Sequence, residues 1–175
     1  MGLPRQSTEE ALLFNGILFA DDSRIDLAVG ELTAEFGAIV HESPVLHWHH
    51  SSYYADELGG EVRRKLILHD STVPQERLVE AKLKTNLIEQ RLSRAGRRTV
   101  NIDPGYLTLS KVVLASTKNY CHRIYLGKGI YAEVTLSFFD GGYQPGRFTY
   151  RDYTQRDYID FFLRGRELLR RGGER

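Results

Sequence analysis

The order of hydrophobic patterns along this chain predicts an α+β fold with a mostly antiparallel sheet. Three observations support it: an apolar run at 12–19, two segments with apolar residues at helical spacing, and a glycine-centred hairpin signal at 127–129. The first six expected elements follow the order β-α-β-β-α-β, that of a ferredoxin-like plait. A C-terminal hairpin and helix would extend this unit into a single domain over residues 1–175.

Two helices are expected in the first 100 residues, each bounded by residue types that begin or end helices. The first follows Asp21, a favourable N-cap residue, and ends before Gly37. The second begins near Pro74, where the missing N–H of proline costs little, and ends before Gly96. Both segments carry apolar residues at helical spacing, so each is expected to bury one face.

The strands are expected before, between and after these helices. An Asp-Pro-Gly turn at 103–105 separates two of them, and the glycines at 127 and 129 join two others as a hairpin. A Pro/Gly loop is expected at 143–153, and a last helix follows it. The expected strands are 12–19, 39–45, 64–69, 100–103, 106–115, 122–126 and 130–138.

The composition argues against a disulfide framework and against insertion into a membrane. Cys121 is the only cysteine, which fits a reducing compartment. Residues 1–10 show no apolar core of a signal peptide, and no apolar run approaches the roughly 20 residues that span a bilayer. We therefore expect a cytoplasmic protein without a membrane partner.

Several segments together resemble one protein family. The stretch 101–136, NIDPGYLTLSKVVLASTKNYCHRIYLGKGIYAEVTL, resembles the signature of a bacterial family known as domain of unknown function 4416. The resemblance covers nearly the whole chain and implies a single-domain cytoplasmic protein with no established activity. Some relatives carry a GTP-binding label, but this chain has no G-x-x-x-x-G-K-[ST] motif. Supporting residues are Tyr53, Tyr54, Glu57, Gly59, Lys65, Lys82, Thr85, Asn86, Glu89, Asp152, Tyr153, Tyr158, Ile159 and Phe161.

Polar residues are concentrated on or beside the expected central strands. Burial of a charge is costly unless the charge is paired, so their presence there needs an explanation. Alternation along a regular strand would place His122 and Arg123 on opposite faces. The members of this central cluster are Asn101, Asp103, Lys111, Lys118, His122, Arg123 and Glu133.

The central cluster allows two interpretations. In the first, its two lysines and either Arg123 or His122 bind a phosphate or carboxylate group. In the second, the charges form internal ion pairs, Arg123 with Glu133 or Lys111 with Asp103. The uneven charge fits an anionic partner, because residues 1–60 carry two basic and ten acidic residues, a balance of −8 in a chain of net charge +1. Folding could also average this asymmetry.

Two further groups lie outside the central strands. His47 and His49 would share one face of a strand, but two ligands are too few for a metal site, so none is predicted. Tyr54, Glu57 and Lys65 could line the mouth of a pocket or form a packed loop.

One face of the second expected helix is also polar. Lys82, Asn86 and Glu89 have helical spacing and share one side. Such a face is usually solvated. If it faces the sheet instead, it joins the central cluster.

Three functions are compatible with these residues. We favour a binding or regulatory protein for a small phosphate- or carboxylate-bearing ligand. An RNA-binding module is the first alternative, since a plait with an open sheet face and exposed tyrosines suits base stacking, although no RNP1-like run is present. A hydrolase-type enzyme is the second, with His122 as acid or base and Asp103 or Glu133 beside it. The final hairpin could offer an edge for a dimer, but the sequence fixes neither the oligomeric state nor a cofactor.

Overall fold

The computed structural model describes residues 10–48, 54 and 57–172. Within them, nine strands form one sheet in the order β2-β4-β1-β5-β6-β8-β7, with β3 beside β4 and β9 beside β8. The elements are β1 (Glu10–Phe19), α1 (Asp22–Phe36), β2 (Ile39–Glu42), β3 (Leu46–His47), β4 (Arg63–Pro74), the 3-10 helix η1 (Gln75–Arg77), α3 (Leu78–Leu92), β5 (Val100–Leu107), β6 (Lys111–Ser116), β7 (Ile124–Gly127), β8 (Ile130–Phe139), β9 (Gly142–Pro145), the 3-10 helix η2 (Arg151–Thr154) and α4 (Arg156–Gly172).

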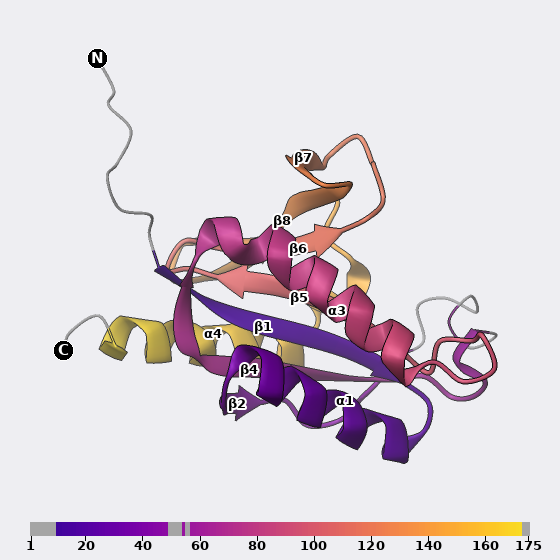
Figure 1. The fold of residues 1–175 in the computed structure, drawn as a ribbon. Coiled ribbons are helices and arrows are strands. Elements are labelled where there is room, and N and C mark those ends of the chain that lie inside the picture. Colours follow the sequence, from indigo (N-terminus) through magenta and orange to yellow (C-terminus); the bar gives the residue numbers. More distant parts are fainter. Residues whose placement is uncertain (1–9, 49–53, 55–56, 173–175) are drawn as a thin grey trace.

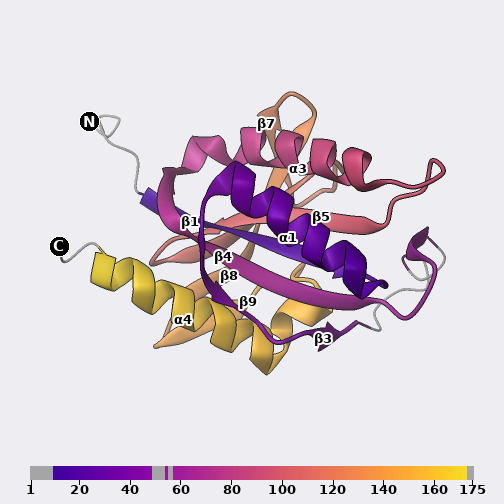
Figure 2. The ribbon, with the colours of Figure 1, turned by 60° about the horizontal axis from the view of Figure 1, so that its bottom comes forward.

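Helices cover both faces of the sheet (Figures 1 and 2). On one face, α1 and α3 pack through Leu32 and Ile88 against a cluster that includes Ile17 of β1. On the other, Phe162 of α4 packs edge-to-face on Phe14 of β1, with ring centroids 4.9 Å apart. Strand β1 is therefore buried on both sides, which explains its continuous apolar run.

The expectation of an α+β fold with a mostly antiparallel sheet is confirmed, because all the strand pairs described are antiparallel. The ferredoxin-like plait is not confirmed. The sheet continues past β5 into β6, β8 and β7, and α4 covers the face opposite α1 and α3. The predicted loop at 143–153 also contains a strand, β9, and the 3-10 helix η2.

The predicted turn at 103–105 is wrong, because all three residues lie inside β5 and pair with β1. The amide of Ile102 points away from β1, toward Glu89 of α3. Pro104 lies two residues further along the strand and has the same orientation, so its missing N–H removes no bond to β1. A proline is therefore tolerated at this position, although in a strand paired on both sides it would remove a hydrogen bond.

Strands β5 and β6 separate after a short contact. They pair only where residues 105–107 meet 112–114, so among the described residues positions 100–104 pair with β1 alone. Side chains of α3 take the place of the missing strand. Lys82 Nζ donates to Ile102 O at 2.9 Å, and Ile102 N donates to Glu89 Oε1 at 2.6 Å. We call this opening between β5 and β6 the divergence.

Gly105 occupies the last paired position before the divergence. A Cβ atom there would lie 2.4 Å from both Phe14 Cζ and the carbonyl oxygen of Val113. One of these atoms is backbone and the ring is fully buried, so neither can move aside without cost. Close approach of β5 to β6 at this point therefore requires glycine.

We predict that Gly105→Ala lowers the free energy of unfolding by about 3 kcal/mol, because the added methyl overpacks the junction of the two strands. Chemical denaturation followed by circular dichroism measures the change. Gly30→Ala is the matched control, since a Cβ at this exposed position of α1 meets no atom within 4 Å. It should leave stability unchanged or raise it slightly. Equal effects of the two substitutions would contradict this account of the junction.

The buried imidazole of His69, in β4, bonds to the neighbouring strand β1 and to the residue that follows α1. Its Nε2 lies 3.0 Å from Asn15 Nδ2, which can only donate, and its Nδ1 lies 2.9 Å from the carbonyl oxygen of Gly37. This pairing requires a neutral ring with its proton on Nδ1. Burial lowers the pKa of His69 below its ordinary value of 6.5.

We predict that His69 makes stability dependent on pH below 6.5. As the pH falls through 6.5, the unfolded chain gains a proton that the folded chain resists, so the free energy of unfolding decreases toward the lower folded-state pKa. His69→Gln should flatten this dependence in urea denaturation between about pH 5 and 7. The exposed His47→Gln serves as the control, and an unchanged slope in His69→Gln would show that the ring does not titrate with folding.

Candidate functional site

A cavity of about 370 Å³ lies beside the divergence, between the sheet and η2. Its apolar wall is rich in aromatic rings, which come from Trp48, Tyr54, Tyr120, Tyr150 and Tyr153. Its charged lining residues are Arg64, Asp103, Lys118, Arg123, Glu133, Arg151 and Asp152. Cavities of this size and mixed character are typical of small-molecule sites.

A second cavity, of about 340 Å³, lies beside α3. It is more polar, and it is lined by Lys82, Asn86, Glu89, Gln90, Arg98, Asn101 and Thr117 together with three residues of the first cavity. The shared residues are Asp103, Ser116 and Lys118. The two cavities therefore meet at the divergence, and we call them together the divergence site.

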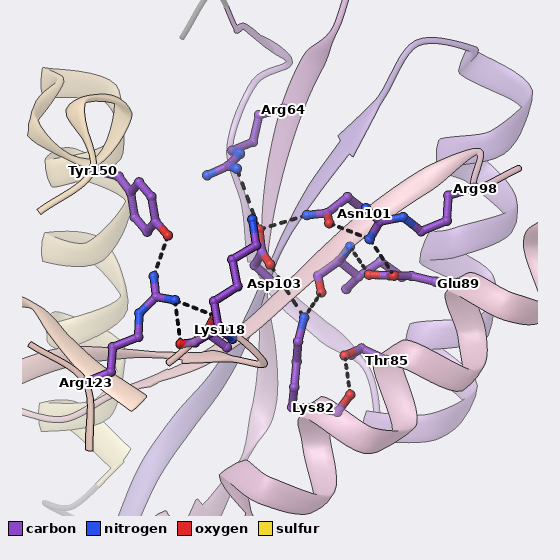
Figure 3. A network of polar contacts seen from close by, with 12 residues as sticks. Arg64, Lys82, Thr85, Glu89, Arg98, Asn101, Asp103, Lys118, Arg123 and Tyr150 are labelled. Carbon is purple, nitrogen blue, oxygen red and sulfur yellow. Dashed lines mark hydrogen bonds and ion pairs between the residues drawn. The ribbon is translucent and has the colours of Figure 1, made fainter. Parts of the chain in front are cut away.

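Asp103 lies at the meeting point, with cations around it (Figure 3). Its carboxylate is 3.7 Å from Arg64 Nη2 and 3.5 Å from Lys82 Nζ, and it accepts a hydrogen bond from Asn101 Nδ2 at 2.9 Å. Figure 3 also shows the side chain of Lys118 extending toward Asp103. Both ion-pair contacts are long and 29% of the Asp103 side chain is exposed, so the carboxylate can still accept a bond from a ligand.

Arg64 is the buried cation of the first cavity. Its Nη1 lies 2.7 Å from Asp152 Oδ2, and both side chains are only 6% exposed. Trp48 Nε1 donates to the same carboxylate oxygen at 3.1 Å. Burial alone would lower the pKa of Arg64, but Asp152, Tyr153, Tyr158 and Asp103 together outweigh it and hold the pKa above the ordinary arginine value. The guanidinium therefore stays charged, and it joins β4 to η2.

Arg98 closes the far end of the second cavity. Its guanidinium donates to both oxygens of Glu57, at 2.8 and 2.7 Å, and also to Glu89 and Asn101. Burial raises the pKa of the Glu89 carboxyl, while Lys82 and the amide of Ile102 oppose this shift. Positive charge on Arg98 and Lys82 thus supports an ionised Glu89 at the unpaired edge of β5.

Arg123 lies in the opposite wall of the first cavity, and nearly all the N–H groups of its guanidinium donate hydrogen bonds to the protein. Nε donates to Glu133 Oε2 at 2.7 Å, and Nη1 donates to Ser116 Oγ at 2.7 Å and to Lys118 O at 3.0 Å. Nη2 donates to the hydroxyl of Tyr150. Arg123 therefore fixes the loop that carries Lys118, and it offers few free donors to a ligand.

His122 and Arg123 face different cavities but contact the same carboxylate. His122 Nε2 lies 2.8 Å from Glu133 Oε2, the oxygen that also accepts from Arg123. The predicted alternation does not apply, because both residues precede β7, which starts at Ile124. The His122 ring stacks on Phe148 with centroids 4.5 Å apart, and its Nδ1 is buried without a partner among the described residues.

The structure brings most of the predicted site residues together. Asn101, Asp103, Lys118, Arg123 and Glu133 line the divergence site, as does Tyr54, while Glu57 supports it through Arg98. The polar face of the second helix also joins it, through Lys82, Asn86 and Glu89. Of the expected internal pairs, Arg123 with Glu133 is present at 2.7 Å.

Besides His122, which lines a different groove, three predicted residues lie elsewhere. Lys65 pairs with Glu42 at 2.9 Å, because neighbours in β4 point to opposite faces and Arg64 takes the one toward the cavity. Lys111 begins β6 and lines a different groove, so it does not pair with Asp103. Exposed His47 contacts Glu61 at 3.1 Å, and His49 lies outside the described residues.

Several residues of the site were not among the predicted ones, among them Trp48, Arg64, Tyr150, Arg151 and Asp152. Arg64 begins an apolar strand, where a single arginine suggests only a strand end. Asp152 and Tyr150 lie in a segment predicted as a loop, and they reach the site because β9 and η2 return the chain toward β4. The signal in the sequence was the alternation of the strand, which places Arg64 on the same face as Leu66, and the structure buries both residues.

Comparison with known proteins identifies the family of this chain. The family described as Domain of unknown function (DUF4416) matches residues 9–168. The chain belongs to this family. No curated protein and no solved structure matches. In the part of the chain that the structure describes, no helix has the length and hydrophobicity needed to cross a bilayer.

We predict that Arg64→Met lowers the free energy of unfolding by about 3 kcal/mol, because it leaves the buried Asp152 carboxylate without its cation. Thermal or urea denaturation at neutral pH measures the loss. Arg156→Met is the control, since Arg156 is 91% exposed in its pair with Asp160 and should give no measurable change. A stable Arg64→Met protein would show that the pair does not hold η2 against β4.

Proposed function

We propose that this chain binds a small anionic ligand, bearing a phosphate or carboxylate, at the divergence site. The observation that carries the proposal is the charge of the first cavity. Four cationic side chains line it against three carboxylates, so an anion would bring the lining closer to neutrality. The cations are Arg64, Lys118, Arg123 and Arg151, and the carboxylates are Asp103, Glu133 and Asp152.

The cations divide into two roles. Arg64 and Arg123 are buried and committed to Asp152 and Glu133, so they set the field and shape of the cavity. Lys118 and Arg151 are exposed residues of the same lining, so their charged groups can meet an anion without first being buried. We therefore assign the direct contacts with the anionic group to Lys118 and Arg151.

The remaining lining indicates the rest of the ligand. Tyr54 and Tyr150 present ring surface, and burial raises the pKa of both hydroxyls, so they stay protonated at neutral pH. Asp103 is partly exposed and can accept a hydrogen bond from a hydroxyl or amino group. The favoured ligand thus combines an anionic group, a flat or ring-shaped body and at least one donor.

We predict that phosphate- or carboxylate-bearing compounds raise the melting temperature of the protein. Phenyl phosphate is the simplest probe, since it joins an anion to a ring, and inorganic phosphate, sugar phosphates and nucleotides complete the panel. Binding to the folded state alone must stabilise it. The proposal is contradicted if no anion stabilises the protein at about 5 mM in differential scanning fluorimetry.

Lys118→Gln tests the assignment within the site. It removes a charge-assisted contact and should weaken binding of phenyl phosphate by about tenfold. Lys128→Gln is the matched control, because this lysine lies in the β7–β8 turn, outside both cavities of the site. Isothermal titration calorimetry compares the two. Equal losses would indicate a non-specific charge effect.

The two alternative functions gain less support. RNA stacking on a plait needs an open sheet face, and β4, β1 and β5 are covered by helices on both sides. Acid-base chemistry at His122 has its carboxylate, Glu133, but the bonded Nε2 and the buried Nδ1 leave no nitrogen facing the first cavity. Both remain predictions. A cytoplasmic location also remains a prediction. It is compatible with the proposed binding of a small anionic ligand.

A further inference from the structure

Strand β7 forms one end of the sheet. Among the described strands it pairs only with β8, so the backbone groups of its other edge have no strand partner. Figure 1 shows β7 extending beyond the helices. Its side chains are apolar and exposed: 71% for Ile124, 59% for Tyr125 and 43% for Leu126. Natural proteins usually protect such an edge with charge, proline or a covering segment.

A groove of about 660 Å³ continues from this edge across β8. Ile124 and Leu126 line it together with Val134, which is 54% exposed, and Phe148, which is 50% exposed. We call these four residues and the free edge of β7 the β7 surface. An exposed apolar surface of this kind, next to an unpaired strand, is typical of a protein-binding site.

The charge in the groove distinguishes between partners. Lys111 and Arg147 line it, and neither has an ion-pair partner among the described residues. Of the two carboxylates in the lining, Glu133 is engaged by Arg123 and His122, which leaves Glu76 alone against two cations. The groove therefore favours a partner that brings negative charge to an apolar contact.

A second copy of this chain does not supply that charge. Antiparallel pairing of β7 with β7 of another copy would bring Lys128 of each chain near residues 122–124 of the other, where Glu133 is already engaged by Arg123. Residues 118–132, which contain the whole edge, include no aspartate or glutamate. Self-association through this edge would thus bring no carboxylate to the cations, whereas an acidic partner would.

We propose that the β7 surface binds an extended segment of a partner protein in which apolar residues alternate with acidic ones. The segment adds a strand to β7 through backbone hydrogen bonds. Its apolar side chains enter the groove between Val134 and Phe148, and an acidic side chain meets Lys111 or Arg147. This site is separate from the divergence site. Glu133 lies between the two, with Arg123 facing the divergence site and His122 facing the groove.

The test uses fluorescein-labelled peptides of about eight residues with alternating valine and glutamate, and the same peptides with lysine for glutamate. We expect saturable binding of the acidic peptide in fluorescence anisotropy and none of the basic one. Ile124→Asp should weaken binding at least about tenfold, because it places a charge at the apolar contact. Lys111→Glu should weaken binding of the acidic peptide and favour the basic one.

Leu27→Asp is the matched control, since Leu27 of α1 is 49% exposed and remote from β7, and it should bind normally. Circular dichroism checks that each variant is folded. Failure of the acidic peptide to bind, or equal binding of both peptides, would overturn the proposal. So would a dimer of the wild-type chain in light scattering that Ile124→Asp separates, because the β7 surface would then belong to a second copy.

Discussion

Residues 100–104 of β5 form a strand edge that β6 leaves uncovered, and the backbone groups of Ile102 on that edge must find partners. Lys82 and Glu89 of α3 supply them, which draws a cation and a carboxylate into the protein interior. Each charge then needs its own partner, and Asp103 and Arg98 fill that need. The divergence of two strands thus accounts for the polar network that lines the second cavity.

The same network bears on both interpretations of the central cluster: the internal pairs are observed, and the anion site is our proposal. Internal pairing is real, as Arg123 with Glu133 and Arg64 with Asp152 show. These pairs do not fill the space between β5 and β6, and they surround cavities instead. Well-packed apolar residues could often replace buried ion pairs without loss of stability, so charges kept around an opening are more consistent with a binding role than with a structural one alone.

The sequence patterns predicted those features of the fold that depend on residues a few positions apart. The apolar run of β1 and the cap at Asp21 located the first strand and helix, because burial and capping act within a few residues. Long-range contacts set the rest. The Asp-Pro-Gly segment predicted a turn, because a strand accepts Pro104 only where β6 has separated from β5. Asp152 was not predicted as a site residue, because its partner Arg64 is far away in the chain. The polar face of α3 was identified, but only the fold shows that it meets the unpaired edge of β5.

Nuclear magnetic resonance of the uniformly ¹⁵N-labelled protein titrated with phenyl phosphate tests the central claim most directly. A ligand at the divergence should shift the amide signals of Ile102, Ser116 and Lys118, with one saturation curve for all three. Signals of β2, on the far side of the sheet, should stay in place. Saturable shifts confined to β2 or the surface of α1, or no shifts at all, would contradict a binding site between β5 and β6.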